Sequence, residues 1–231
     1  WRLLEIIIHY KKKKIKVYQA SSSEMFGKSK PPQNENTLFQ PRSVYAISKV
    51  FAYHSVIHYR EAYNLHACNG ILFNHESPRR GVNFVTKKIV QGLTRIKQGK
   101  QKNLILGNLY SRRDWGHAKD YVESMWKILQ QKNPDDFVVA TRTSHSVKDF
   151  INICAKKLGI KLLWKNKGLK EVGIDKSNDK IIIRIDKKYF RETEVDDLIG
   201  DFSKAKKLLK WQPKYSFNKL VDDMIEKEKY E

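Results

Sequence analysis

The sequence predicts an α/β fold in which a doubly wound parallel sheet is joined to a smaller α/β domain. Short apolar runs alternate with longer segments of helical periodicity along most of the 231 residues. Polar residues follow two of these runs directly, as they do at the carboxyl edge of a parallel sheet. Hydrophobic residues make up 40% of the chain, which is enough to fill a core between helical layers.

The first elements are the most clearly marked. The opening segment WRLLEIIIHY is typical of the end of a helix, and a buried strand is expected over 15–20. A loop rich in Ser, Pro and Asn follows over 21–42, and Ser43 is a suitable N-cap for a helix that extends to Tyr63. This helix carries apolar residues on most faces, which predicts burial on more than one side.

The later elements continue the alternation. Strands are expected at 68–73, 103–106 and 136–140, helices at 83–98, 117–131, 146–158, 202–210 and 216–229, and short strands or turns over 161–185. Because helices separate the strands, the sheet should be parallel and covered by helices on both faces.

The net charge of +21 raises the question of nucleic-acid binding. The excess is mostly lysine, with 35 Lys against 11 Arg, and it is spread along the whole chain. Proteins that read bases and phosphates rely on clustered arginine. The charge therefore favours a solvated, lysine-rich surface over a nucleic-acid interface, and some of it could attract an anionic small molecule.

The sequence also indicates the cellular compartment of the protein. No apolar run approaches the ~20 residues of a membrane span. Cys68 and Cys154 stand in no metal or redox spacing, and no secretory signal is present, so a cytosolic protein without a metal site is expected. The chain starts at Trp1 inside a helical segment and has no glycine before Gly27, so we expect it to be the later part of a longer protein.

Two short strings carry the chemistry. In VYQASSSEMFGK, Ser22 and Glu24 are two residues apart, so in extended geometry both side chains would point the same way. In SVYAISK, Tyr45 and Lys49 are four apart and share a helix face. A phenol titrates near ~10 in water and a nearby ammonium favours its anion, so this pair makes a base usable near neutral pH. The Ser22 hydroxyl could hold the oxygen that Tyr45 deprotonates.

A Tyr-x-x-x-Lys string by itself is weak, because a surface lysine beside a core tyrosine gives the same pattern. Together with a strand-end Ser, the set resembles the extended short-chain dehydrogenase/reductases, which have a Rossmann-like nucleotide-binding domain. Longer strings resemble the GDP-mannose 4,6-dehydratases, and the resemblance covers essentially the whole chain. These strings include YQASSSEMFGK, PRSVYAISK, ACNGILFNHESPRRG and GNLYSRRDWGHAKDYVESMW.

The resemblance implies a hydro-lyase that converts GDP-mannose to GDP-4-keto-6-deoxymannose through NADP, the first step towards GDP-fucose and related deoxysugars. Tyr45, supported by Lys49, would remove the hydroxyl proton at carbon 4 while NADP⁺ takes the hydride. Ser22 would steady that oxygen. Glu24 would take the proton of carbon 5 and help the carbon 6 hydroxyl leave as water, after which the hydride returns to carbon 6.

The resemblance also implies binding residues. Tyr45, Lys49, His75 and Arg80 would contact the cofactor, whereas a structural histidine is the alternative for His75. The substrate would be bound by Asn74, Lys88, Arg113, Arg191 and Glu194. For these five, ordinary surface ion pairing is the alternative.

The resemblance further implies a domain division and an assembly. Residues 1–78 would be the later part of the Rossmann domain, with 115–150 packing back on it, and 79–114 with 151–231 would bind the sugar nucleotide. The outer face of the helix at 43–63 should pair with a second copy in a homodimer or homotetramer. Nothing before Gly27 can supply the glycine-rich turn that cradles a cofactor diphosphate, so this chain alone should bind NADP⁺ poorly, be inactive and aggregate.

Two other functions stay open at this point. One is a sibling sugar-nucleotide epimerase, reductase or dTDP-sugar dehydratase, which Glu24 in SSSE and the string NHESPRRG argue against. The other is a non-catalytic basic module that has lost the cofactor-binding half.

Overall fold

The computed structural model describes residues 1–10, 14–190, 193 and 197–228. The chain divides into two compact units. Unit 1 comprises Trp1–His75, Arg113–Ser144 and Asp197–Lys214, and unit 2 comprises Glu76–Arg112, His145–Asp196 and Tyr215–Glu231. The segment Asp197–Lys214 thus belongs to unit 1, although the sequence places it in the substrate-binding part. The chain passes between the units five times, and three of these passages fall within short strands, β3 (Asn74–Glu76), β5 (Arg112–His117) and β7 (Ser144–Ser146).

Unit 1 is built on a parallel sheet in the order β1-β2-β6. Its strands are β1 (Val17–Ser22), β2 (Ala67–Leu72) and β6 (Phe137–Val139). Ser22 lies opposite Leu72, and Leu72 lies opposite Val139, so the carboxyl ends of the three strands form one row. In the part of the chain that the structure describes, β1 pairs with β2 alone and is an edge strand.

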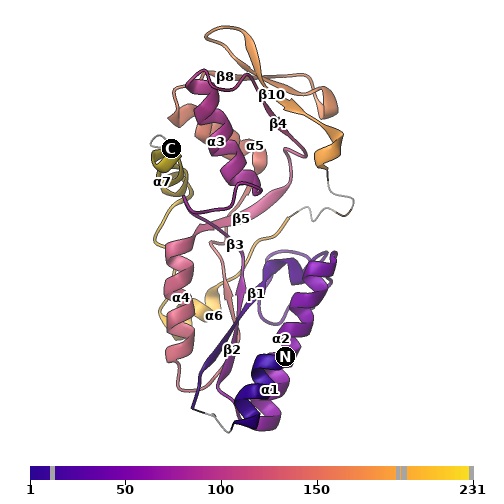
Figure 1. Ribbon diagram of the computed structural model, residues 1–231, viewed down its shortest axis with the longest axis vertical. Coiled ribbons are helices and arrows are strands. Elements are labelled where there is room, and N and C mark those ends of the chain that lie inside the picture. The colour runs from indigo at the N-terminus through magenta and orange to yellow at the C-terminus, as the bar shows by residue number, and fades with distance from the viewer. Residues whose placement is uncertain (11–13, 191–192, 194–196, 229–231) are drawn as a thin grey trace. The chain divides into compact units, whose positions relative to one another are not determined.

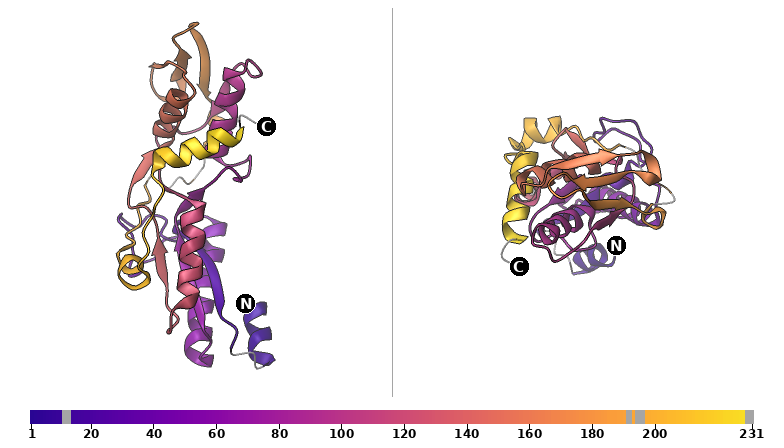
Figure 2. Two further views of the ribbon diagram at one scale, coloured as in Figure 1. Left: turned by 90° about the vertical axis from the view of Figure 1, so that its left-hand side faces the viewer. Right: turned by 90° about the horizontal axis from the view of Figure 1, so that it is seen from above.

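Helices cover both faces of this sheet, as the sequence predicts. Helix α2 (Val44–Tyr63) packs on one face, while α4 (Ala118–Gln130) and α6 (Ser203–Leu209) pack on the other (Figure 1). Helix α1 (Arg2–His9) lies along α2 on the same side, which the view in Figure 2 also shows. The core beneath α4 and α6 contains Trp211, Tyr121 and Phe137, and the core beneath α1 and α2 contains Leu4, Ile7, Val56, Tyr59 and Leu65.

Helix α2 confirms the expected start and end. The Ser43 hydroxyl accepts a hydrogen bond from the Ala46 amide at 3.1 Å, and Asn64 ends the helix in the left-handed conformation with φ 53°. Burial on more than one side, however, is wrong for this chain by itself. One stripe is buried, whereas Ile47 and Phe51 on the opposite face are 56% and 63% exposed.

A buried polar network anchors the far end of α2 to the sheet. Arg60 makes two parallel bonds to the Asp136 carboxylate, at 2.9 and 2.8 Å, and donates to the Ala67 carbonyl at 3.1 Å. Asn69 donates to Asp136 from its backbone and its side chain, and accepts from Ser21 at 3.1 Å. Burial raises the pKa of Asp136, but these bonds outweigh it and lower the pKa overall. The network therefore fixes α2, β2 and the end of β1 relative to one another.

Unit 2 pairs a mixed sheet with three helices. The sheet has the order β4-β10-β9-β8, in which β4 (Leu104–Leu106) is parallel to β10 (Lys180–Ile185) and the other pairings are antiparallel. Strands β8 (Leu162–Lys165) and β9 (Val172–Asp175) complete it. Helices α3 (Val85–Lys97), α5 (Val147–Lys157) and α7 (Phe217–Glu228) pack against one another, and α3 and α5 also pack on the sheet. No described helix is long and apolar enough to cross a membrane.

Candidate active site at the carboxyl edge of the parallel sheet

Lys49 connects helix α2 to the end of strand β1. Its Nζ donates a hydrogen bond of 2.8 Å to the carbonyl oxygen of Ala20 and lies 5.6 Å from the centre of the Tyr45 ring. The contact with Ala20 uses one of the three N–H groups of the ammonium. Tyr45 and Lys49 are therefore held together at the carboxyl edge of the sheet.

Tyr45 lies on the inner stripe of α2 and is nevertheless 54% exposed. Positions 45, 49, 53 and 56 share one helix face, and Tyr53 and Val56 on that face are buried. Tyr45 lies in the first turn of α2, whereas Tyr53 and Val56 lie further along the helix. Because it is exposed, the Tyr45 ring is accessible to a ligand.

Ser22 and Glu24 occupy a different local geometry from the one that the sequence suggests. Strand β1 runs to Ser22 itself, two residues further than expected, and Glu24 lies in a short 3₁₀ helix, Ser23–Met25. The Ser22 hydroxyl caps this turn by accepting from the Glu24 amide at 3.2 Å. The expectation of extended geometry at Glu24 is therefore wrong, because the cap bends the chain immediately after Ser22. Helix α2 packs against this turn as well as against β1.

Strand β2 ends beside β1, and Asn74 and His75 follow it in the short strand β3. The ring Nδ1 of His75 lies 2.9 Å from the Phe73 carbonyl oxygen, and because a carbonyl can only accept, Nδ1 carries the proton. The His75 ring stacks on Tyr121 with ring centres 4.8 Å apart. The Asn74 side-chain oxygen is buried and has no hydrogen-bond partner within the described residues. A buried acceptor of this kind is suited to a ligand that brings a donor.

Arg80 is held tightly within unit 2. Its Nε lies 3.0 Å from a carboxylate oxygen of Glu76, and its guanidinium lies 3.5 Å from the centre of the Phe84 ring. Thr86 donates a 2.6 Å hydrogen bond to the same carboxylate. Burial raises the pKa of Glu76 to about 7, while Arg80 and Thr86 oppose that shift. Arg80 is thereby held by an acid and an aromatic face, an arrangement suited to presenting its remaining N–H groups to an anion.

The other expected substrate residues lie on other elements or outside the described residues. Lys88, on α3, lies over the Tyr189 ring at 4.1 Å from its centre. Arg113, on β5, is 8% exposed, so it is a buried rather than a surface arginine. Arg191 and Glu194 lie outside the described residues. The described part of the chain holds no group of three His, Cys, Asp or Glu side chains that could bind a metal ion.

Sequence reasoning missed several buried acids near these residues. Asp114, in the string RRDWGHAKDY, is fully buried and accepts four hydrogen bonds around residues 141, 142 and 200. Burial raises its pKa to about 6, against the effect of those bonds. Glu76 and Asp114 both stand inside motif strings among binding residues, which was the available signal, but an acid in a string does not reveal its burial.

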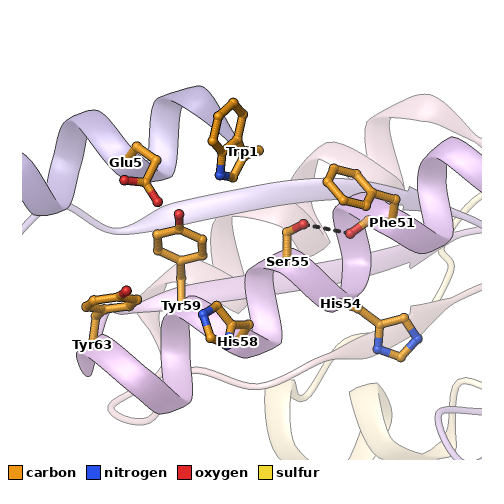
Figure 3. A pocket seen from close by; sticks show the side chains of 8 residues that line it. All are labelled: Trp1, Glu5, Phe51, His54, Ser55, His58, Tyr59 and Tyr63. Atoms are coloured by element: carbon orange, nitrogen blue, oxygen red, sulfur yellow. Dashed lines mark hydrogen bonds between the residues drawn. The ribbon is translucent and has the colours of Figure 1, made fainter.

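A separate groove runs along α1 and α2 and does not include Tyr45 or Lys49. It has a volume of about 660 Å³. Figure 3 shows side chains from both helices facing it: Trp1, Glu5, Phe51, His54, Ser55, His58, Tyr59 and Tyr63. Glu5 is the one acid among them, and neither Lys nor Arg contributes.

Comparison with known proteins identifies close relatives. The family model for GDP-mannose 4,6 dehydratase matches residues 1–224. A GDP-mannose 4,6 dehydratase of Dictyostelium discoideum is 52% identical over 217 residues, covering 94% of this chain and 61% of that protein. GDP-mannose 4,6 dehydratase 1 of Arabidopsis thaliana is 55% identical over 214 residues, covering 93% of this chain and 55% of that protein. The chain thus spans between half and two thirds of the length of these relatives.

Solved structures show the same fold at low sequence identity. The dTDP-glucose 4,6-dehydratase of Bacillus anthracis, in complex with NAD, has a TM-score of 0.79 and 21% identity, covering 99% of this chain and 65% of that one. RMD from Pseudomonas aeruginosa, in complex with NADPH, has a TM-score of 0.76 and 17% identity, covering 93% and 66%. These likenesses confirm the predicted α/β, Rossmann-like fold.

Proposed function

Because the chain belongs to the GDP-mannose 4,6 dehydratase family, we propose that it takes part in converting GDP-mannose to GDP-4-keto-6-deoxymannose, with NADP as cofactor. The observation that carries the proposal is the pairing of Tyr45 with Lys49 above the end of β1, next to Ser22 and Glu24. A dehydratase needs a proton acceptor for the sugar hydroxyl and a second acid–base group for the elimination. This edge of the sheet supplies residues of both kinds.

The residues present fit a nicotinamide dinucleotide. Lys49 keeps two N–H donors beyond its bond to Ala20, which suits the hydroxyls of a ribose. Asn74 offers a buried acceptor without a partner in the described chain, and Arg80 offers a fixed guanidinium for a phosphate. When bound, NADP⁺ supplies a reversible acceptor for the hydride of carbon 4. We assign Tyr45, Lys49, His75 and Arg80 to this cofactor.

Two side chains of this protein then transfer different protons of the sugar. Tyr45 takes the proton of the carbon 4 hydroxyl, and the Ser22 hydroxyl donates a hydrogen bond to that oxygen and holds it in place. Glu24 removes the proton of carbon 5 and returns it to the carbon 6 hydroxyl, which leaves as water. Glu24 lies in the 3₁₀ turn that Ser22 caps, which supports a shared position for the two side chains at this sheet edge. Asn74, Lys88, Arg113, Arg191 and Glu194 are proposed to bind GDP-mannose.

Two alternatives are less well supported. A sibling epimerase, reductase or dTDP-sugar dehydratase shares the fold, but identity to GDP-mannose 4,6 dehydratases is 52%, against 21% for the dTDP-glucose 4,6-dehydratase. A purely basic binding module does not require a Tyr–Lys pair at a sheet edge. A sibling enzyme would use the same Tyr–Lys pair, so sequence identity and Glu24 argue against it, whereas a binding module would leave that pair without a purpose.

We further propose that the groove of α1 and α2 receives a second copy of the chain. Exposed Ile47 and Phe51 line the same outer face of α2. Two copies that each carry a charge of +21 repel one another, and they approach most easily where the lining residues include no Lys or Arg, as in this groove. A homodimer, or a homotetramer built from it, follows from this face.

Turnover of GDP-mannose tests the proposal directly. The protein, purified as its source produces it, should convert GDP-mannose to the 4-keto-6-deoxy product in the presence of NADP⁺, followed by mass spectrometry of the nucleotide sugar. dTDP-glucose and UDP-glucose serve as comparison substrates. Preferential turnover of either of these sugars would overturn the assignment in favour of a sibling enzyme.

A further inference from the structure

Arg142 has a backbone conformation that arginine rarely adopts. Its φ is 67°, in the left-handed region. There a Cβ atom is unfavourable, and glycine, asparagine or aspartate are the usual occupants. Strain of this kind persists only where the surroundings enforce it, and it is concentrated at sites of function. No motif or pattern in the sequence marks Arg142.

The structure places Arg142 at the same sheet edge as the catalytic set. Strand β6 ends at Val139, which stands in one row with Leu72 and Ser22. Arg142 follows three residues beyond that row. Since neighbouring strands are ~4.8 Å apart, the end of β6 is about 10 Å from the end of β1. A nucleotide that reaches from Tyr45 across the sheet edge would pass this loop.

Asp114 holds the strained loop in place. One of its carboxylate oxygens accepts from the Thr141 amide at 2.8 Å and from the Thr141 hydroxyl at 2.6 Å. The other accepts from the Arg142 amide at 2.9 Å and the Gly200 amide at 3.3 Å. Because Asp114 is completely buried, these bonds are shielded from water and fix the Arg142 backbone.

The Arg142 side chain is exposed and makes no hydrogen bond or ion pair within the described chain. Its charge helps to lower the pKa of Asp201, but that carboxylate accepts hydrogen bonds from the amide and hydroxyl of Ser203 rather than from Arg142. The guanidinium fork is thus presented to solvent from a rigid base. A fork of this geometry matches the oxygens of a phosphate.

We infer that Arg142 binds a phosphate group of the nucleotide that occupies the carboxyl edge of the sheet, in either the sugar nucleotide or the dinucleotide. The inference rests on the proposed function for the presence of such a nucleotide. In this interpretation, the strained backbone that Asp114 holds gives the Arg142 cation a fixed attachment point three residues beyond the end of β6.

The variant Arg142→Gly distinguishes an effect on binding from an effect on folding, because it should weaken nucleotide binding while it stabilises the folded protein. Glycine relieves the left-handed backbone, so the melting temperature should rise by about 2–4 °C. Loss of a charge-assisted fork should weaken binding of GDP-mannose or of NADP⁺ by about tenfold or more. Calorimetric titration with each nucleotide separately shows which of them supplies the phosphate.

Lys210→Gly is a matched control. Lys210 is an exposed basic residue of the same unit with φ 50°, and it lies at the end of α6, where its carbonyl accepts from Lys127. Its replacement should raise the melting temperature similarly and leave both affinities unchanged. Arg142→Lys, which keeps the charge but loses the fork, should retain part of the affinity.

Unchanged affinity of Arg142→Gly for both nucleotides would overturn the inference, and so would a parent protein that binds neither. A parent that binds one of them without turning over GDP-mannose would refute the proposed function alone. In that case a tenfold loss in Arg142→Gly still supports the phosphate contact.

Discussion

The Nζ atom of Lys49 donates a 2.8 Å hydrogen bond to the carbonyl oxygen of Ala20, which joins helix α2 to the last residues of β1. The same ammonium lies over the Tyr45 ring. This contact between residues 29 positions apart ties the helix that carries the phenol to the strand that carries Ser22.

Replacing Lys49 with Met should affect catalysis far more than folding. The variant loses one hydrogen bond from a half-buried lysine, worth about 1 kcal/mol of unfolding free energy. It also loses the cation beside Tyr45, so GDP-mannose turnover should fall by about 100-fold or more. Lys16→Met is the control, because Lys16 donates a similar 2.7 Å bond to the Leu129 carbonyl. Equal losses of turnover in both variants would show that Lys49 has only a structural role.

Glu24→Gln and Tyr45→Phe should block different steps of the reaction. Without the Tyr45 hydroxyl, the first proton has no acceptor, and turnover should fall by ~100- to 10,000-fold with no slow oxidation of the sugar. Without the Glu24 carboxylate, water elimination should stop, while slow oxidation at carbon 4 remains visible by ultraviolet absorbance of the reduced dinucleotide. Normal release of water by Glu24→Gln would mean that another residue is the base.

Glu76→Gln should change how stability depends on pH. The pKa of Glu76 is raised from 4.5 to about 7 by burial, so between these values the folded protein keeps a proton that the unfolded chain has released. The free energy of unfolding therefore falls as pH rises through this window. In Glu76→Gln this fall should be smaller, on the order of 1–3 kcal/mol over the window.

Chemical denaturation at several pH values within that window measures the change. Gln keeps an oxygen that can accept from Thr86, so the 2.6 Å bond has a replacement. Glu61→Gln, which removes an exposed carboxylate on α2, should leave the slope as it is in the parent. A parent and Glu76→Gln with identical slopes would show that Glu76 is ionised throughout this range.

Phe51→Glu should disrupt self-association. The Phe51 ring is 63% exposed and lines the groove of α1 and α2, so the change places a charge where the partner copy is expected. The dissociation constant measured by sedimentation should rise by about tenfold or more, because burying an unpaired carboxylate is costly. Leu169→Glu, a similar change at an exposed leucine of unit 2, should have no effect. A parent that sediments as a monomer at micromolar concentration would refute the proposed interface.

Local physical chemistry was sufficient for most of the elements. The Ser43 cap, the extent of α2 and the parallel order implied by alternating strands and helices are properties of short segments, and each is confirmed. The helix at 147–157 likewise begins with a capping box between Ser146 and Asp149. The spacing of Tyr45 and Lys49 also fixed their common face, since four residues on a helix nearly complete one turn.

The tertiary structure decided what depends on burial and on long-range bonds. The turn at Glu24 is 3₁₀ because the Ser22 hydroxyl caps it, and no periodicity marks such a cap in advance. Whether α2 is buried on one face or two depends on its neighbours, which an all-round apolar pattern does not name. The raised pKa values of Glu76 and Asp114 follow from desolvation by residues distant in sequence. The sequence by itself thus determined the helices, the parallel strands of unit 1 and the common face of Tyr45 and Lys49, whereas it did not predict the short strands β3, β5 and β7. Packing decided where acids are buried and where Arg142 is strained, because both depend on contacts between residues far apart in the chain.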